Sequence, residues 1–216
     1  MNNKIDVHVL YCHEPRHWID ACLKSMDREP VNIYLMKGIK RKVGLARAKA
    51  FSVGNSEYVS FVDSDDLVRI GCFETLAKIL DNHPEVVSAY CDLRVMNEYN
   101  IFTGSYIKDA WRPWKQLWSL AEVHHCHLMR RKYVELYLEE LEKWDSYEEW
   151  VLMGLLSRHG QHYHVPKILY NFRQHSSYER AGALINREMR QRGFDLIAPT
   201  LLAQHRAGVR QLEHAA

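Results

Sequence analysis

The stretch Tyr58-Val59-Ser60-Phe61-Val62-Asp63-Ser64-Asp65-Asp66 decides the fold of this 216-residue chain. A short, mostly apolar run is followed at once by three carboxylates in four positions. Such a run predicts a buried strand at residues 58–62. Because ligands bind beyond the carboxyl ends of the strands in open α/β sheets, the acidic tetrapeptide is predicted to lie at a binding site.

Strand and helix patterns alternate on both sides of this segment. Strand patterns occur at residues 5–11, 31–36 and 86–91, and helical patterns at residues 18–26, 44–53 and 73–80. The alternation predicts an α/β fold with a mostly parallel central sheet flanked by helices on both faces.

The second half of the chain has less regular patterns. Residues 98–127 carry Trp111, Trp114 and Trp118 with little periodicity, which predicts irregular structure or short helices. The remaining predicted elements are helices at 132–143 and 147–158, the latter ended by Gly160, strands at 162–165 and 168–172 separated by Pro166, and a helical tail at 183–205.

Composition narrows the class of protein. The length suits one domain, and 29 basic against 27 acidic residues leave no global field that demands nucleic acid or a membrane as partner. Five cysteines, an odd number without a Cys-x-x-Cys pair, favour a reducing compartment. Neither an export signal nor an apolar run of about 18 residues is visible, so we expect no integral membrane span and a cytoplasmic location.

The three carboxylates of the acidic tetrapeptide would repel one another unless a cation or hydrogen-bond donors compensate their charge. Mg²⁺ or Mn²⁺ explains them best, because hard cations take carboxylate oxygens and bridge to phosphates. An EF-hand calcium loop is disfavoured because Val68 and Glu74 stand at its sixth and twelfth positions, and the former should be glycine. A phosphatase aspartate is disfavoured by Asp66 and Leu67 where Gly and Thr are usual, and helix capping would account for only one of the three carboxylates.

Dinucleotide and P-loop motifs are absent, whereas other motifs accompany the acidic segment in order. They read Val-His-Val-Leu-Tyr-Cys-His-Glu-Pro at 7–15, Ala-Cys-Leu-Lys-Ser at 21–25, Gly-Leu-Ala-Arg-Ala-Lys-Ala at 44–50, Tyr-Glu-Glu-Trp at 147–150 and Tyr-Asn-Phe-Arg-Gln-His at 170–175. Together with residues 57–66 they resemble the family 2 glycosyltransferases of GT-A fold, although Ala48 replaces the usual Asn. The resemblance spans residues 5 to about 175.

The resemblance implies a metal-dependent, inverting glycosyltransferase that moves a sugar from a nucleotide diphosphate donor, a UDP- or GDP-sugar, to an acceptor hydroxyl. It implies that Asp65, Asp63 and His175 hold Mn²⁺ or Mg²⁺, with Asp66 as a second-choice ligand. The implied nucleotide-sugar contacts are Glu14, Arg47, Asp63, Ser64 and Asp65, with the basic loop at residues 40–42 as a further phosphate contact. Met36-Lys37-Gly38 follows the second strand where the family often has an Asp that reads uracil, so the donor base stays open.

Glu149 occupies the position of the family's catalytic Asp, which makes it the expected base, with Glu148 as the alternate. A carboxylate base is competent if burial raises its pKa toward the working pH. The alternative is that both are first-turn glutamates favoured by the helix dipole.

The acceptor is expected to be a surface glycan or a lipid-linked saccharide, and a hydroxymethylated DNA base is a second option. His124, His125 and His127 lack a zinc-binding frame, so we expect them to line a polar acceptor pocket or the surface. The three tryptophans are expected in core or lid packing, with stacking on a sugar or a base as the alternative.

We expect a single domain over residues 1–216. Residues 1–97 form its nucleotide-sugar-binding half, residues 98–180 its acceptor-side half and residues 181–216 a C-terminal helical tail. Two other functions stay open: a non-catalytic nucleotide- or carbohydrate-binding module of the same fold, and a phosphohydrolase that depends on Asp63.

Overall fold

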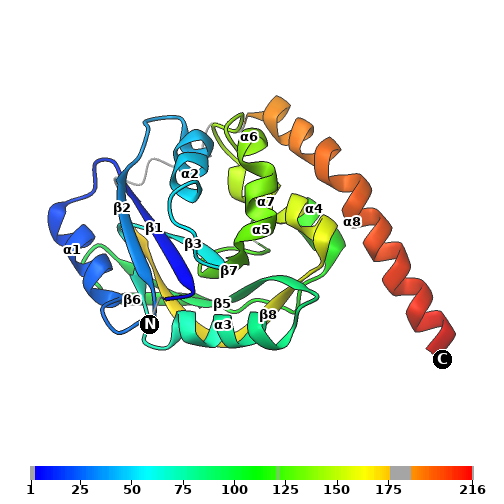
Figure 1. Cartoon of the computed structure of the whole chain (residues 1–216), viewed down its shortest axis with the longest axis horizontal. Coiled ribbons are helices and arrows are strands. Elements are labelled where there is room, and N and C mark those ends of the chain that lie inside the picture. Colours follow the sequence, from blue (N-terminus) through cyan, green and yellow to red (C-terminus); the bar gives the residue numbers. More distant parts are fainter. Residues whose placement is uncertain (1–2, 121, 176–185, 216) are drawn as a thin grey trace.

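The structure is a computed structural model that describes residues 3–120, 122–175 and 186–215, and it is a mixed α/β fold (Figure 1). The strands are β1 (Ile5–Tyr11), β2 (Asn32–Lys37), β3 (Tyr58–Asp63), β4 (Leu67–Val68), β5 (Val86–Asn97), β6 (Phe102–Tyr106), β7 (His127–Arg130) and β8 (Gln161–Gln174). The helices are α1 (Arg16–Ser25), α2 (Val43–Phe51), α3 (Cys72–Asn82), α4 (Pro113–Trp118), α5 (Arg131–Val134), α6 (Leu138–Leu141), α7 (Glu148–Leu156) and α8 (Arg187–Ala215), with 3₁₀ turns η1 (Glu135–Tyr137) and η2 (Ser157–His159).

The central sheet has the strand order β2-β1-β3-β7-β5-β8-β4, with β6 paired to β5. β1 runs parallel to both β2 and β3, and β5 runs parallel to β8. β7 is antiparallel to both β3 and β5, so the sheet is mixed. The predicted α/β fold with flanking helices is confirmed, while the mostly parallel arrangement holds only for β2-β1-β3 and β5-β8.

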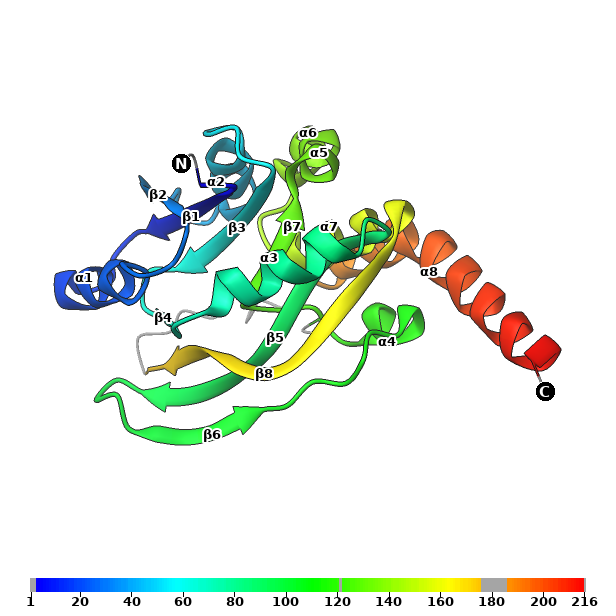
Figure 2. The same ribbon diagram turned by 60° about the horizontal axis from the view of Figure 1, so that its bottom comes forward.

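The turn after β5 explains why β7 is antiparallel. β8 pairs with β5 along the whole length of β5, so β6 and β7 share the other edge of β5. Figure 2 shows β6 alongside the long strands β5 and β8. β6 pairs with residues 93–96 and β7 with residues 88–90, both antiparallel to β5. Residues 107–126, which include α4, therefore leave this edge after β6 and return to it at β7.

The two faces of the sheet carry different helices. Apolar residues of α1 and α3 pack with Val7, Val9 and Val62 on one face. Apolar residues of α2, α5, α6 and α7 pack with Val59 and Phe61 on the other. Successive strand residues point to opposite faces, so the alternation along β3 decides which helices each side chain meets.

Two predicted elements were wrong in detail. The two short strands expected around Pro166 are one strand, β8, whose pairing with β5 skips from Val165 to Ile168. Proline lacks the N–H that a sheet ladder needs, and here a local irregularity absorbs it without ending the strand. The helix expected at 132–143 is broken into α5, η1 and α6, with Tyr137 at φ −122° between them.

The C-terminal helix α8 packs its apolar residues through its first half, and farther along Gln204 donates a hydrogen bond to the Ser157 carbonyl oxygen. Ile197 and Leu201 pack with Leu117 of α4 and Trp150 of α7. Gly154 makes this contact possible, because a β-carbon at that position would lie 2.7 Å from the Ile197 side chain. The far end of α8 extends beyond the rest of the fold (Figure 1). Of the predicted tail, residues 183–185 lie outside the described part.

None of the helices in the described part of the chain combines the length and the apolar character that a membrane span requires.

Candidate active site

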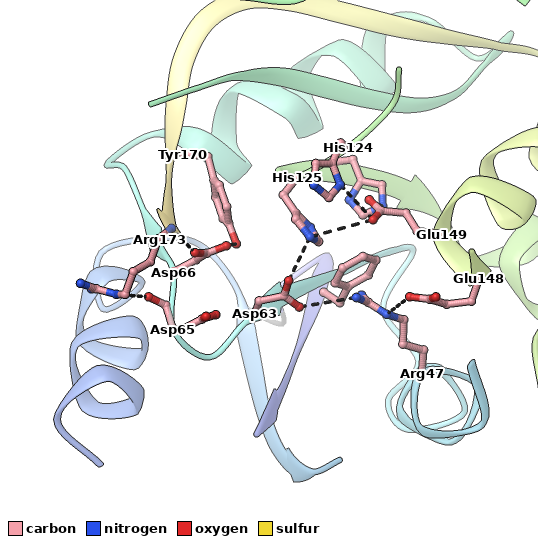
Figure 3. A network of polar contacts seen from close by, with 12 residues as sticks. Arg47, Asp63, Asp65, Asp66, His124, His125, Glu148, Glu149, Tyr170 and Arg173 are labelled. Carbon is pink, nitrogen blue, oxygen red and sulfur yellow. Dashed lines mark hydrogen bonds and ion pairs between the residues drawn. The ribbon is translucent and has the colours of Figure 1, made fainter. Parts of the chain in front are cut away.

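Asp63 is the last residue of β3, and the strand alternation decides what it faces. Val59 and Phe61 lie on the face covered by α2 and α7, so Asp63, two residues beyond Phe61, points the same way. Figure 3 shows its carboxylate between Arg47 of α2 and His125 of the segment before β7. Its Oδ1 lies 3.5 Å from Arg47 Nη2 and its Oδ2 lies 3.0 Å from His125 Nε2.

These two cations decide the charge of Asp63. Burial by itself raises the pKa of this carboxyl, but His125 and then Arg47 outweigh that effect and hold it well below its usual range. Asp63 is therefore ionised at neutral pH, with a side chain that is still 35% exposed.

The contacts of Asp66 indicate a structural role. It is fully buried, accepts a hydrogen bond of 2.8 Å from the Tyr170 hydroxyl and accepts another of 2.6 Å from the backbone N–H of Arg173. Burial and the neighbouring Asp65 raise the pKa of Asp66 well above its usual value. Both oxygens of Asp66 thus fasten the acidic loop to β8, which leaves Asp63 and Asp65 to face the site.

Asp65 and His175 form the strongest candidate for the expected divalent-metal site. Asp65 Oδ2 lies 2.9 Å from His175 Nε2, which brings the acidic loop and the end of β8 together as predicted. Two neighbouring ligands of an octahedral ion at ~2.1 Å are about 3 Å apart, so the pair fits one Mg²⁺ or Mn²⁺. Burial, together with Asp63, raises the pKa of Asp65, as expected for carboxylates that lack a full complement of positive charge.

Arg47 connects the acidic loop to the start of α7. Its Nε lies 2.9 Å from Glu148 Oε1, and its guanidinium carbon lies 3.2 Å from the centre of the Phe61 ring. Arg47 and Glu148 are both buried, and burial raises the pKa of Glu148 although Arg47 counteracts it. Arg47 therefore holds two carboxylates, Asp63 and Glu148, from different elements.

Glu149 lies among three histidines. Its Oε2 is 2.9 Å from His124 Nδ1 and 3.9 Å from His125 Nε2, and its Oε1 is 3.7 Å from His127 Nε2. Burial by itself raises the pKa of Glu149, but the three imidazoles outweigh it and place the pKa well below the usual value. The condition stated for a competent base, a pKa raised by burial toward the working pH, is therefore not met, because these imidazoles lower the pKa of Glu149 instead.

The histidines themselves differ in charge. Burial lowers the pKa of His125, but Glu149 and Asp63 on either side of its Nε2 reverse this and raise it to about 9. Burial dominates for His127 and lowers its pKa to about 3. His125 is thus a buried cation that joins the acidic loop to α7.

Glu14 and Ser64 are the other two residues predicted to contact the nucleotide. Glu14 follows β1 at the same sheet edge, since Leu10 pairs with Asp63, but its carboxylate accepts hydrogen bonds from the backbone N–H groups of Cys12 and His13. Ser64 is buried, and within the described residues its hydroxyl has no hydrogen-bond partner.

The basic loop at residues 40–42 and the tryptophans make their contacts outside the cluster around Asp63. Lys42 pairs with Asp145 at 2.7 Å, with both side chains exposed. Trp111 packs edge-on against His162. Trp118 contacts Phe194 of α8 but is 66% exposed, and Trp114 is exposed as well, so the expected core packing does not hold for these two.

The sequence reasoning missed His125 as the partner of Asp63. A usable signal was the alternation of His125 and His127, which places both on the face toward Phe61, 4.8 Å from its ring. Lys108 was also missed; it donates hydrogen bonds to the carbonyl oxygens of His124 and His125 and so holds this segment in place.

Comparison with solved structures shows a shared fold. Crystal structures of S. aureus TarS share the fold: residues 1–349 in complex with UDP-GlcNAc superpose with a TM-score of 0.68 at 15% identity, over 91% of this chain and 66% of that chain. The complex of TarS 1–349 with UDP gives 0.58 at 16% identity, over 79% and 60% of the two chains. This chain thus spans 66% or less of the length of these relatives.

No curated protein sequence is significantly similar to the chain. The sequence model of glycosyl transferase family 2 matches residues 13–138, more than half of the chain, including α2, β3 and the acidic loop. The chain therefore belongs to glycosyl transferase family 2.

Proposed function

We propose that the protein transfers a sugar, with inversion, from a nucleotide diphosphate donor to an acceptor hydroxyl. The observation that carries the proposal is the continuous set of ion pairs from Asp63 through Arg47 and His125 to Glu148 and Glu149. It joins the acidic loop at the carboxyl end of β3 to two carboxylates at the start of α7. Sugar transfer needs both parts, the first as the donor side and the second as the acceptor side.

The donor side is the acidic loop. Asp65 and His175 would hold Mn²⁺ or Mg²⁺, which supplies a fixed positive charge to neutralise the departing diphosphate. Asp63, whose charge raises the pKa of Asp65, pairs with Arg47, and these two residues are suited to orient the ribose and the phosphates. The TarS complexes with UDP-GlcNAc and UDP favour a UDP-sugar over a GDP-sugar as the first donor to test.

The acceptor side is Glu149. It is ionised, as a base must be, and its Oε1 is buried without a hydrogen-bond partner in the described part of the chain. This oxygen is available to take the proton of an acceptor hydroxyl, while Glu148 holds Arg47. The three histidines weaken Glu149 as a base, so we expect the arriving substrate to rearrange their contacts. We assign the acceptor to surface glycans or lipid-linked saccharides, and we place the reaction in the cytoplasm, with which five free cysteines are compatible.

A donor panel tests the proposal. The full chain is incubated with Mn²⁺ and UDP-, GDP- or TDP-sugars, and its melting temperature is recorded. A donor at 100 times its Kd adds ~2.7 kcal/mol, which for a chain of this size raises the melting temperature by roughly 5–10 °C. The best donor is then offered to saccharide and hydroxymethylated DNA acceptors, and the product is identified by mass and by the anomeric coupling constant.

The same assay separates the alternatives. A binding module would give the thermal shift without product or slow donor hydrolysis, and a phosphohydrolase would release phosphate from an aryl phosphate. No shift with any donor, with and without Mn²⁺, contradicts the proposal.

A further inference from the structure

The histidines around Glu149 have the composition and spacing of a metal site that is separate from the Asp65–His175 pair. One ligand atom each from His124, His125 and Glu149 lie within 4.8 Å of one another. Two tetrahedral ligands of Zn²⁺ at ~2.1 Å are about 3.4 Å apart, and Glu149 Oε2 lies 2.9 Å from His124 Nδ1 and 3.9 Å from His125 Nε2. Figure 3 shows the two imidazoles converging on this carboxylate.

Unsatisfied polar atoms mark the same place. Glu149 Oε1, His125 Nδ1 and both ring nitrogens of His127 are buried without hydrogen-bond partners among the described residues. Buried polar groups are normally paired, and four unpaired atoms, one on the Glu149 carboxylate and three on neighbouring imidazoles, are unusual for a purely structural cluster. His127 Nε2 lies 3.7 Å from Glu149 Oε1 and adds a third imidazole at the edge of the group.

The group is held in place and is open on one side. Lys108 donates hydrogen bonds of 3.0 and 3.4 Å to the carbonyl oxygens of His124 and His125, which fixes the backbone that carries both imidazoles. The His125 side chain is 3% exposed and that of Glu149 12%, whereas that of His124 is 27% exposed and borders solvent. An ion can therefore reach the group past His124.

The donor atoms determine which ion fits. Two imidazole nitrogens and a carboxylate oxygen suit Zn²⁺ or Co²⁺, whereas Mg²⁺ prefers oxygen ligands. Asp63 Oδ2, 3.0 Å from His125 Nε2, is in reach as a fourth ligand.

We infer that His124, His125 and Glu149 form a binding site for a zinc-like transition-metal ion, and that its occupancy inhibits sugar transfer. The ion would bind Glu149 Oε2 and draw negative charge from the carboxylate whose other oxygen, Oε1, an acceptor hydroxyl needs as its base. The inhibition rests on the proposed function, whereas the binding site does not.

Cobalt titration tests the site without any activity measurement. The untagged full chain, freed of metal, is titrated with Co²⁺, and the visible absorption of a tetrahedral cobalt centre is recorded. We expect the tetrahedral absorption to reach the same maximum in the unchanged protein and in His175→Ala, because that substitution leaves all three ligands in place. His124→Ala, whose side chain is partly exposed, should weaken binding by at least ~100-fold, since even the loss of an outer partner weakens metal binding 10- to 100-fold.

His13→Ala, at an exposed turn, is the matched control and should bind like the unchanged protein. Circular dichroism confirms that each variant is folded. An absent cobalt spectrum, or a spectrum that persists in His124→Ala, overturns the metal site.

Zinc inhibition is measured separately with the best donor. Zn²⁺ should inhibit the unchanged protein and leave His124→Ala at least ~100-fold less sensitive, in line with its weaker binding. A cobalt spectrum in a protein that transfers no sugar would refute the proposed function and leave the metal site standing.

Discussion

The acidic loop after β3 and the start of α7 both gather carboxylates, yet the two regions balance their charge differently. In the loop, the oxygens of Asp66 accept hydrogen bonds from a hydroxyl and a backbone N–H, and the Arg173 guanidinium donates to backbone carbonyl oxygens. At α7, Glu148 meets the guanidinium of Arg47 and Glu149 meets three imidazoles.

The outcome differs between carboxylates within each region. The pKa values of Asp65 and Asp66 are raised, first by burial and then by the neighbouring carboxylates, whereas those of Asp63 and Glu149 are lowered because their cationic partners outweigh burial. Asp65 and Asp66 therefore lack positive charge, which a divalent ion can supply beside Asp65, while Asp63 and Glu149 obtain theirs from side chains. A carboxylate motif alone does not reveal which case applies.

The largest expected effect is that of Glu149→Gln. Because Glu149 is the proposed base, the substitution should lower turnover by about 10²- to 10⁴-fold. Donor affinity should be kept, since the acidic loop is unchanged. Turnover is measured as release of nucleoside diphosphate, and donor affinity by thermal shift. Glu148→Gln is the matched control and should affect stability more than turnover, since Glu148 pairs with buried Arg47. Turnover within tenfold of the unchanged protein would exclude Glu149 as the base.

Asp65→Asn should lower turnover by about 10²- to 10³-fold, the size found when one group that stabilises developing charge is removed. In contrast to Glu149→Gln, it should also abolish the part of the donor-induced thermal shift that depends on Mn²⁺. Glu74→Gln, an exposed carboxylate on α3, serves as control. If Asp65→Asn keeps the Mn²⁺-dependent shift, the metal does not lie at the acidic loop.

His162 shows what burial does to a histidine without a carboxylate partner. Burial lowers its pKa to about 4, although a hydrogen bond with the Met153 carbonyl oxygen opposes this. Between pH 6.5 and 4 the unfolded chain binds a proton that the folded chain does not, so stability falls as the pH falls. From pH 7 to 5 this should lower the free energy of unfolding by roughly 2 kcal/mol, measured by urea denaturation.

His162→Gln should remove this contribution to the pH dependence of the free energy of unfolding, even if the substitution changes the stability of the protein at a given pH. An unchanged slope between pH 7 and 5 would show that His162 is protonated inside the folded protein.

The smallest effect is expected for Lys42→Gln. Lys42 Nζ lies 2.7 Å from Asp145 Oδ2, but the side chains are 52% and 40% exposed, so the pair should contribute less than about 1 kcal/mol. The melting temperature should fall by no more than about 4 °C. A larger fall would mean that exposed pairs around α2 matter as much as the buried pair of Arg47 and Glu148.

Local patterns predicted β1, β2, β3 and the helices α1, α2 and α3 with small boundary errors, because alternation and helical periodicity depend on near neighbours. β5, expected at residues 86–91, continues to Asn97. The same patterns failed for β8, where Pro166 is absorbed within one strand, and for residues 131–141, where helices break at Tyr137. The antiparallel direction of β7 was not predicted, since it follows from an excursion of residues 107–126 out of the sheet edge.

The amino-acid order alone was enough to place Asp63 at the end of a buried strand and to group the acidic residues with the family motifs. It did not show that Asp66 fastens the loop to β8, or that His125 and Arg47 join Asp63 to α7. These contacts link residues 16 to 107 positions apart. Charge and pKa depend on distances of a few ångströms between elements, and those distances exist only after the helices have packed onto the sheet.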